Sequence, residues 1–132
     1  MSETSPQKMR VSINISVEGV GVLEGEFIRF YAPLTVRDLL RIMPIEGFAA
    51  KWDYAVYIQV DLKRGAERKI DKISGGDILY WPPGPYLLIA FKEAIPPSQI
   101  VRVGRIEKNY ERLEKVNPGS RIRITIAEST LL

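Results

Sequence analysis

The segment from Tyr80 to Phe91 is the most informative part of the chain, and it runs Tyr-Trp-Pro-Pro-Gly-Pro-Tyr-Leu-Leu-Ile-Ala-Phe. Proline fixes φ and glycine allows a reversal of direction, so the centre of this segment is predicted to be a turn. Ile78–Trp81 before the turn and Tyr86–Phe91 after it are too apolar for a hairpin with one face in water. We therefore predict two strands of a closed or covered sheet. Trp81–Pro82 is a candidate cis bond, because X-Pro bonds adopt that form more readily than others.

Alternation of apolar and polar residues predicts further strands. Met9–Val17 alternates regularly, which indicates a strand with one buried face, and Val22–Phe30 follows a turn as its antiparallel partner. The other predicted strands are Lys51–Val60, Gln99–Ile106 and Arg121–Ala127. In the last of these, Ile122, Ile124 and Ile126 are expected to point inward.

Two short segments have helical spacing instead. In the first, Thr35 is expected to be the N-cap with Asp38 at the capping-box position, and Pro44 ends the helix. Its apolar positions are Val36, Leu39, Leu40 and Met43. Ile45–Ala50 is expected to be a connection, and Asn109–Val116 a second short helix.

This order of elements predicts a mainly β fold, a barrel whose open ends are covered by the two helices. The length of 132 residues fits one domain, which we place at residues 9–127. Residues 1–8 are expected to be a disordered N-terminal tail and residues 128–132 a C-terminal tail.

The chain contains no cysteine and no histidine. Disulfides, thiolate nucleophiles, imidazole bases and zinc or copper sites built from these residues are therefore excluded. We expect no metal and no cofactor. The absence of cysteine, with many Ile, Lys, Arg and Glu residues, favours a heat-adapted source.

The net charge of +3 arises from basic and acidic side chains that alternate along the chain, so we do not expect a nucleic-acid interface. No apolar run is long enough to span a membrane. The polar N-terminus has no signal-peptide pattern, and we expect a cytoplasmic location.

The sequence resembles a family of small archaeal and bacterial proteins that have a cyclophilin-like barrel and no assigned function. The resemblance extends from Met9 to Ile126, and its most specific part is Gly76–Gly84, Gly-Asp-Ile-Leu-Tyr-Trp-Pro-Pro-Gly. Val103–Ile106 and Leu113–Val116 match weaker pieces of the family pattern in the same order. The resemblance implies a closed, mostly antiparallel eight-stranded barrel with helices at its ends.

Active cyclophilins are peptidyl-prolyl isomerases that hold an X-Pro peptide in an aromatic pocket. Their site combines an arginine, a histidine and a glutamine–phenylalanine–phenylalanine strand. This chain has no histidine, and its matching strand Leu88–Phe91 lacks the glutamine and the first phenylalanine. Because no catalytic residue carries over, we expect a module that binds a peptide or a small molecule without demonstrable catalysis. A weak prolyl isomerase and a structural or interaction subunit are the alternatives.

Six residues are candidates for ligand binding. Trp52 and Tyr57 are expected to line an aromatic cleft, with Tyr86 and Phe91 on the neighbouring strand. Tyr54, which lies between Trp52 and Tyr57 in the sequence, is considered with them as a further lining residue. Gln59 is expected to present an amide to a peptide backbone, and Arg105 to bind a carboxylate or phosphate. The competing interpretations are ordinary strand packing for the aromatic residues, the polar position of an alternating strand for Gln59, and surface display for Arg105.

Overall fold

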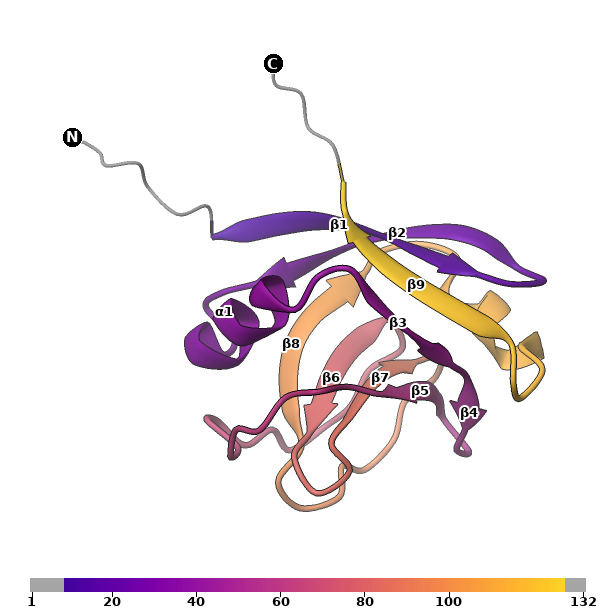
Figure 1. Cartoon of the computed structure of the whole chain (residues 1–132). Coiled ribbons are helices and arrows are strands. Elements are labelled where there is room, and N and C mark those ends of the chain that lie inside the picture. Colours follow the sequence, from indigo (N-terminus) through magenta and orange to yellow (C-terminus); the bar gives the residue numbers. More distant parts are fainter. Residues whose placement is uncertain (1–8, 128–132) are drawn as a thin grey trace.

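The computed structural model describes residues 9–127, and the predicted tails 1–8 and 128–132 lie outside these residues. Nine antiparallel strands of this part form one sheet in the order β3-β9-β1-β2-β8-β6-β7-β5-β4 (Figure 1). The strands are β1 (Arg10–Val17), β2 (Gly21–Ile28), β3 (Ile45–Phe48), β4 (Ala50–Lys51), β5 (Ala55–Gln59), β6 (Asp77–Trp81), β7 (Tyr86–Ala90), β8 (Val101–Ile106) and β9 (Arg121–Ile126). The mainly β fold is confirmed.

The sheet closes on itself through one short segment. Its two outermost strands, β3 and β4, are consecutive in the chain and are separated only by Ala49. β3 pairs with β9, and β4 pairs with β5. The barrel is therefore nearly closed, and the nine strands become the predicted eight if β3 and β4 are counted as one bent strand.

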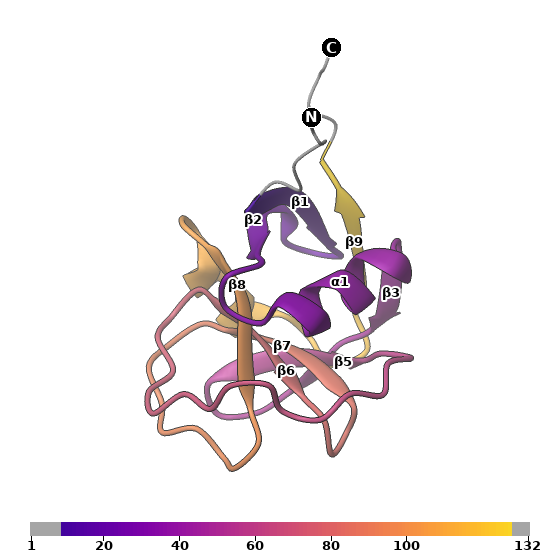
Figure 2. The ribbon, with the colours of Figure 1, turned by 90° about the vertical axis from the view of Figure 1, so that its left-hand side faces the viewer.

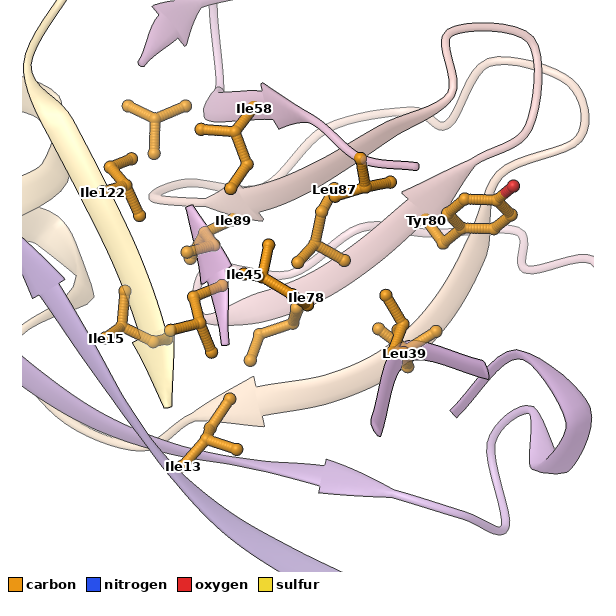
Figure 3. Close-up of a cluster of buried hydrophobic side chains, with 14 of the residues drawn as sticks. Ile13, Ile15, Leu39, Ile45, Ile58, Ile78, Tyr80, Leu87, Ile89 and Ile122 are labelled. Carbon is orange, nitrogen blue, oxygen red and sulfur yellow. The ribbon is translucent and has the colours of Figure 1, made fainter. Parts of the chain in front are cut away.

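The barrel interior is filled by inward-facing apolar side chains from every strand except β4. Figure 3 shows part of this cluster. Ile13 and Ile15 from β1, Ile78 from β6 and Ile89 from β7 are among those that meet there, each almost wholly buried. Burying one such side chain contributes about 1.5–3 kcal/mol, so this cluster is the main source of stability.

Helix α1 (Pro33–Arg41) and the short 3-10 helix η1 (Tyr110–Lys115) lie on opposite sides of the barrel (Figures 1 and 2). Val36 and Leu39 of α1 and Leu113 of η1 join the interior cluster. The expectation that the helices cover the barrel ends is confirmed.

The predicted N-cap of the first helix is wrong. The N-cap is Ala32, and Thr35 lies within the first turn of α1. The side chain of Glu67 caps the helix instead, accepting hydrogen bonds from the N–H groups of Leu34 (3.1 Å) and Thr35 (2.5 Å). Asp38 does not form a capping box, because its carboxylate contacts Arg64 at 2.6 Å.

Three further expectations need correction. The predicted connection Ile45–Ala50 contains β3, since it finds a partner in β9. The predicted strand Lys51–Val60 is a hairpin, β4 and β5, in which the N–H of Trp52 donates to the carbonyl of Ala55. Ile126 is 52% exposed although Ile122 and Ile124 are buried, because it is the last residue of β9.

The turn in Tyr80–Phe91 is confirmed, with Trp81 of β6 directly opposite Tyr86 of β7. The N–H of Gly84 donates to the carbonyl of Trp81 at 3.2 Å and tightens the reversal. The cis peptide bonds of residues 9–127 are Met43–Pro44 and Gly84–Pro85, so the Trp81–Pro82 bond is trans.

An irregularity in the pairing of β6 with β8 decides which β8 side chains face outward. Ile78 pairs with Gly104 but Leu79 pairs with Arg102, which leaves Val103 as an extra residue in β8. Arg102 and Arg105 are three residues apart and would otherwise lie on opposite faces of the sheet. The bulge lets both guanidinium groups reach Asp77.

Candidate functional site

The outer side of β5, β6 and β7 carries a second apolar cluster, separate from the barrel interior. Strand alternation directs Leu79 of β6 and Leu88 of β7 outward, where they pack with Ala55, Ile73, Ala90 and Ile100. Half-buried aromatic rings lie against this layer. Because both sides of these strands are apolar, their sequences lack the usual polar positions of a surface strand.

Five aromatic side chains form one continuous group on this outer side, which we call the aromatic face: Trp52, Tyr54, Tyr57, Trp81 and Tyr86. The centroids of Tyr57 and Tyr86 are 4.7 Å apart, and those of Trp52 and Tyr57 are 4.9 Å apart. Trp52 meets Trp81 edge-on at 5.5 Å. These separations are in the range of favourable aromatic pairs, so the rings hold one another in place.

Two local features of the sequence assemble the aromatic face. The tight turn between β6 and β7 places Trp81 opposite Tyr86, and their rings stack at 6.0 Å with an interplanar angle of 19°. The β4–β5 hairpin then brings Trp52 and Tyr54 beside them, because both residues flank its tip at Asp53.

An open hollow of about 650 Å³ adjoins the aromatic face. It is lined by Lys51, Trp52, Asp53, Tyr54, Trp81 and Pro97. Pro97 belongs to the loop after β7, and the same loop fixes Trp81, whose indole Nε1–H donates to the carbonyl of Ser98 at 3.0 Å. With its only donor engaged, Trp81 presents a purely apolar surface to the hollow.

The ionisable groups of the hollow are few. Burial raises the pKa of the Tyr54 hydroxyl, so Tyr54 is a neutral hydrogen-bonding group at physiological pH. The ammonium group of Lys51 donates to the backbone carbonyl of Glu114. Asp53 is exposed at the hairpin tip. The hollow therefore combines flat apolar surface with one neutral hydroxyl and two charges at its edge.

The structure brings together three of the six predicted residues, namely Trp52, Tyr57 and Tyr86. Gln59 is exposed at the end of β5 and lies directly opposite Tyr86, so it borders the aromatic face. Phe91 lies in the barrel interior and is 6% exposed. Its position follows from the alternation, since Tyr86, Leu88 and Ala90 of the same segment face outward.

Arg105 lies away from the aromatic face, on the outer side of β8. Its Nη1 is 3.3 Å from Oδ1 of Asp77, and Nη2 of Arg102 is 3.0 Å from Oδ2 of the same carboxylate. The side chain of Asp77 is 1% exposed and also accepts a hydrogen bond from the N–H of Ser74. This arrangement neutralises a buried carboxylate, which is a structural requirement of the strand pairing.

Trp81 and Tyr54 are members of the aromatic face outside the six predicted residues. The signal for Trp81 is present in the sequence: Ile78 and Tyr80 face inward, so alternation directs Leu79 and Trp81 outward. Tyr54 is expected from the sequence to accompany Trp52 and Tyr57, and the β4–β5 hairpin places its ring 6.1 Å from that of Trp52.

Within residues 9–127, no group of three or more aspartate or glutamate side chains is arranged to hold a metal ion. Nor does that part of the chain contain a helix long and apolar enough to cross a membrane.

Comparisons with known proteins agree with this architecture. No match is found among curated proteins. A solved structure from Archaeoglobus fulgidus, the solution structure of the hypothetical protein AF2241, is similar with a TM-score of 0.74 and 25% sequence identity. The similarity covers 94% of this chain and 100% of the archaeal one. The sequence profile of the cyclophilin-like family matches residues 9–125, nearly all of the described part. The chain therefore belongs to the cyclophilin-like family.

Proposed function

We propose that the protein is a binding module that holds a flat apolar group of a peptide or small molecule against the aromatic face. The observation that carries the proposal is the group of five half-exposed rings beside an open hollow of about 650 Å³. Small-molecule sites are typically concave and lined by apolar and aromatic side chains with a few polar groups.

The aromatic face is ordered before any ligand arrives, which favours binding. Trp52 contacts Tyr54, Tyr57, Trp81 and Tyr86, and Trp81 is also held by Ser98. Rings that are already fixed lose little conformational freedom when a ligand binds. A ligand would thus gain apolar contact without the cost of ordering these side chains.

A binding role fits the hollow better than catalysis does. General acid–base chemistry needs a titratable group tuned near neutral pH and aimed at the ligand. Tyr54 is shifted the opposite way, toward a higher pKa. Lys51 is engaged with Glu114, and Asp53 is exposed to water.

Energy transfer from tryptophan tests the proposal directly, because both tryptophans of the chain, Trp52 and Trp81, belong to the aromatic face. The probe is 1-anilinonaphthalene-8-sulfonate, a dye with a flat apolar naphthalene ring and one sulfonate group, excited through these two residues. We expect saturable transfer with one dye per chain. Trp52→Ala should weaken dye binding by about tenfold, measured by the dye's own fluorescence, since tenfold corresponds to about 1.4 kcal/mol of lost contact.

Phe48→Ala is the matched control, because Phe48 is 67% exposed, packs against the guanidinium group of Arg121 and is not one of the five rings of the aromatic face. Its removal should leave the affinity unchanged. Equal weakening by Trp52→Ala and Phe48→Ala, or no saturable binding at all, would contradict the proposal.

A protease-coupled assay with the peptide succinyl-Ala-Ala-Pro-Phe-p-nitroanilide distinguishes prolyl isomerase activity from binding without catalysis. We expect no rate above the uncatalysed background at micromolar protein. A rate that disappears in Trp52→Ala but persists in Phe48→Ala would replace the binding role with catalysis.

A further inference from the structure

A second hollow, of about 620 Å³, lies where β2 and β8 separate. Its walls are the first half of β2 on one side and the segment Glu107–Asn109 on the other, with β1 at its base. β8 pairs with β2 only at Gly25–Phe27. Beyond Ile106 the chain leaves the sheet toward η1, and among the described residues no strand pairs with Gly21–Glu24 of β2 on that side.

The hydrogen-bond pattern identifies which backbone groups of β2 face this hollow. Even-numbered residues of β1 bond to β9, as the bonds Glu18 N–H to Arg121 O and Ala127 N–H to Ser12 O show. Odd-numbered residues of β1 therefore bond to β2, and their partners in β2 are also odd-numbered. The N–H and C=O groups of Val22 and Glu24 consequently point away from β1, into the hollow.

These four backbone groups have no hydrogen-bond partner within residues 9–127. Unpaired strand edges of this kind are templates for pairing with another chain. Adding one extended segment would satisfy all four groups, since opposite residues of an antiparallel pair exchange two hydrogen bonds.

The side chains beside the edge indicate the chemistry of the added segment. Val22 is 60% exposed on the outer side of β2 and suits an apolar residue directly opposite. Glu24, two residues further on the same side, is exposed and forms no ion pair with another described residue.

The charges of the hollow favour a basic segment. Its five ionised side chains are Glu24, Glu26, Glu107, Arg105 and Lys108. Glu26 contacts Arg10, and Arg105 lies between Asp77 and Glu107, so Glu24 is the carboxylate of the hollow that has no ion pair with another described residue. A second copy of this chain would bring its own Glu24 to the same edge, and like charges across a strand pair are destabilising.

We propose that the Val22–Glu24 edge binds an extended peptide with the pattern basic-x-apolar, which adds an antiparallel strand to β2. The basic residue lies opposite Glu24 and the apolar residue opposite Val22. The residue between them turns its N–H and C=O away from β2. This site is separate from the aromatic face and does not depend on the function proposed for it.

The test uses the peptide acetyl-Lys-Thr-Val-amide with fluorescein on its C-terminal amide, because Ile106 already occupies the position opposite Gly25. Binding is measured by fluorescence anisotropy with the full chain. We expect saturable binding that Glu24→Lys weakens at least about tenfold, because the ion pair becomes a repulsion. The Trp52→Ala variant should bind this peptide with unchanged affinity. A negative dye-binding result at the aromatic face would therefore leave the outcome of the peptide test unchanged.

Two N-methylated peptides provide the decisive comparison. Methylation of the Lys and Val nitrogens removes the donors that face β2 and should abolish binding. Methylation of the central Thr nitrogen, which faces away, should preserve it. Equal affinity of the two methylated peptides, or no binding of the unmodified peptide, would overturn the proposal. Slowed hydrogen exchange at the Val22 and Glu24 amides on adding peptide would support it.

Discussion

Glu67 caps helix α1 from a loop 32 residues away, with Oε1 accepting hydrogen bonds from both the backbone N–H (2.5 Å) and the hydroxyl (2.6 Å) of Thr35. The carboxylate also lies at the positive end of the helix dipole. One ionised side chain therefore fixes the start of α1 and ties the connection between β5 and β6 to it.

This cap predicts a pH-dependent stability. Burial alone would raise the pKa of Glu67, but the hydrogen bonds from Thr35 and Leu34 outweigh it and lower the pKa. A carboxyl group whose pKa is lowered by folding stabilises the protein above its unfolded pKa, and that contribution is lost as the pH falls through the folded value. We expect Glu67→Gln to cost about 1 kcal/mol at neutral pH in urea unfolding. The difference in unfolding free energy between Glu67→Gln and the parent should disappear at pH values below the ordinary pKa range of glutamate.

Glu93→Gln is the control for this prediction, because Glu93 pairs with Lys72 on the surface and both side chains are more than 60% exposed. Its effect at neutral pH should be smaller than that of Glu67→Gln. A difference between Glu67→Gln and the parent that persists in acid would show that the cap does not depend on charge.

Asp77 is predicted to be the most sensitive charged position of the barrel wall. Asp77→Asn keeps the shape but leaves Arg102 and Arg105 without their shared carboxylate. Breaking such a pair is strongly destabilising, and because the arginines are partly exposed we expect about 2–4 kcal/mol in chemical unfolding. Adding Arg102→Met should recover part of this loss by removing one unpaired guanidinium group. No recovery would indicate that the damage arises from strand pairing and not from charge.

Gly104 is predicted to tolerate no side chain. A Cβ there would lie 2.1 Å from the carbonyl oxygen of Glu26, a backbone atom of the paired strand β2. Gly104→Ala should therefore cost about 3 kcal/mol or more in thermal or chemical unfolding. Gly25→Ala, with its nearest contact at 3.0 Å, should cost less, and Gly65→Ala, with open space around it, should be within about 0.5 kcal/mol of the parent. Equal stabilities of the three variants would contradict the close approach of β2 and β8.

The two tryptophans are predicted to stabilise each other. Their edge-on contact at 5.5 Å should appear as a coupling of about 0.5–1.5 kcal/mol in a double-mutant cycle of Trp52→Leu and Trp81→Leu. The cycle of Trp52→Leu with Phe48→Leu is the reference and should be additive. A coupling of zero between the tryptophans would mean that the aromatic face is less ordered than the structure indicates.

The regular strands were predictable because their signal is local. Period-two alternation identified β1 and β9, and the apolar run around Pro82–Gly84 identified β6 and β7 with their turn. These patterns are produced by burial of one or both faces of a strand, and burial constrains every residue within it.

The errors share a different cause, which is dependence on distant partners. Thr35 was assigned as an N-cap by a local rule, but Glu67 supplies the cap through space. β3 is a strand because β9 pairs with it, and the residues Ile45–Phe48 contain no local pattern that predicts this pairing. The aromatic face is predictable in part for the same reason: Tyr57 and Tyr86 lie on recognisable strands, whereas the β4–β5 hairpin that sets Trp52 against Trp81 forms through strand pairing.

The closure of the barrel at Ala49 has a consequence for the protein during its synthesis. β3 on one side of that residue and the outer edge of β1 both pair with β9, which follows the other eight described strands in the chain. A growing chain on the ribosome can form the β1–β2 hairpin and the β5–β6–β7 group early, but the barrel stays open until Arg121–Ile126 emerges. Emergence of β9 is therefore the step at which the nascent chain pairs the exposed edges of β1 and β3.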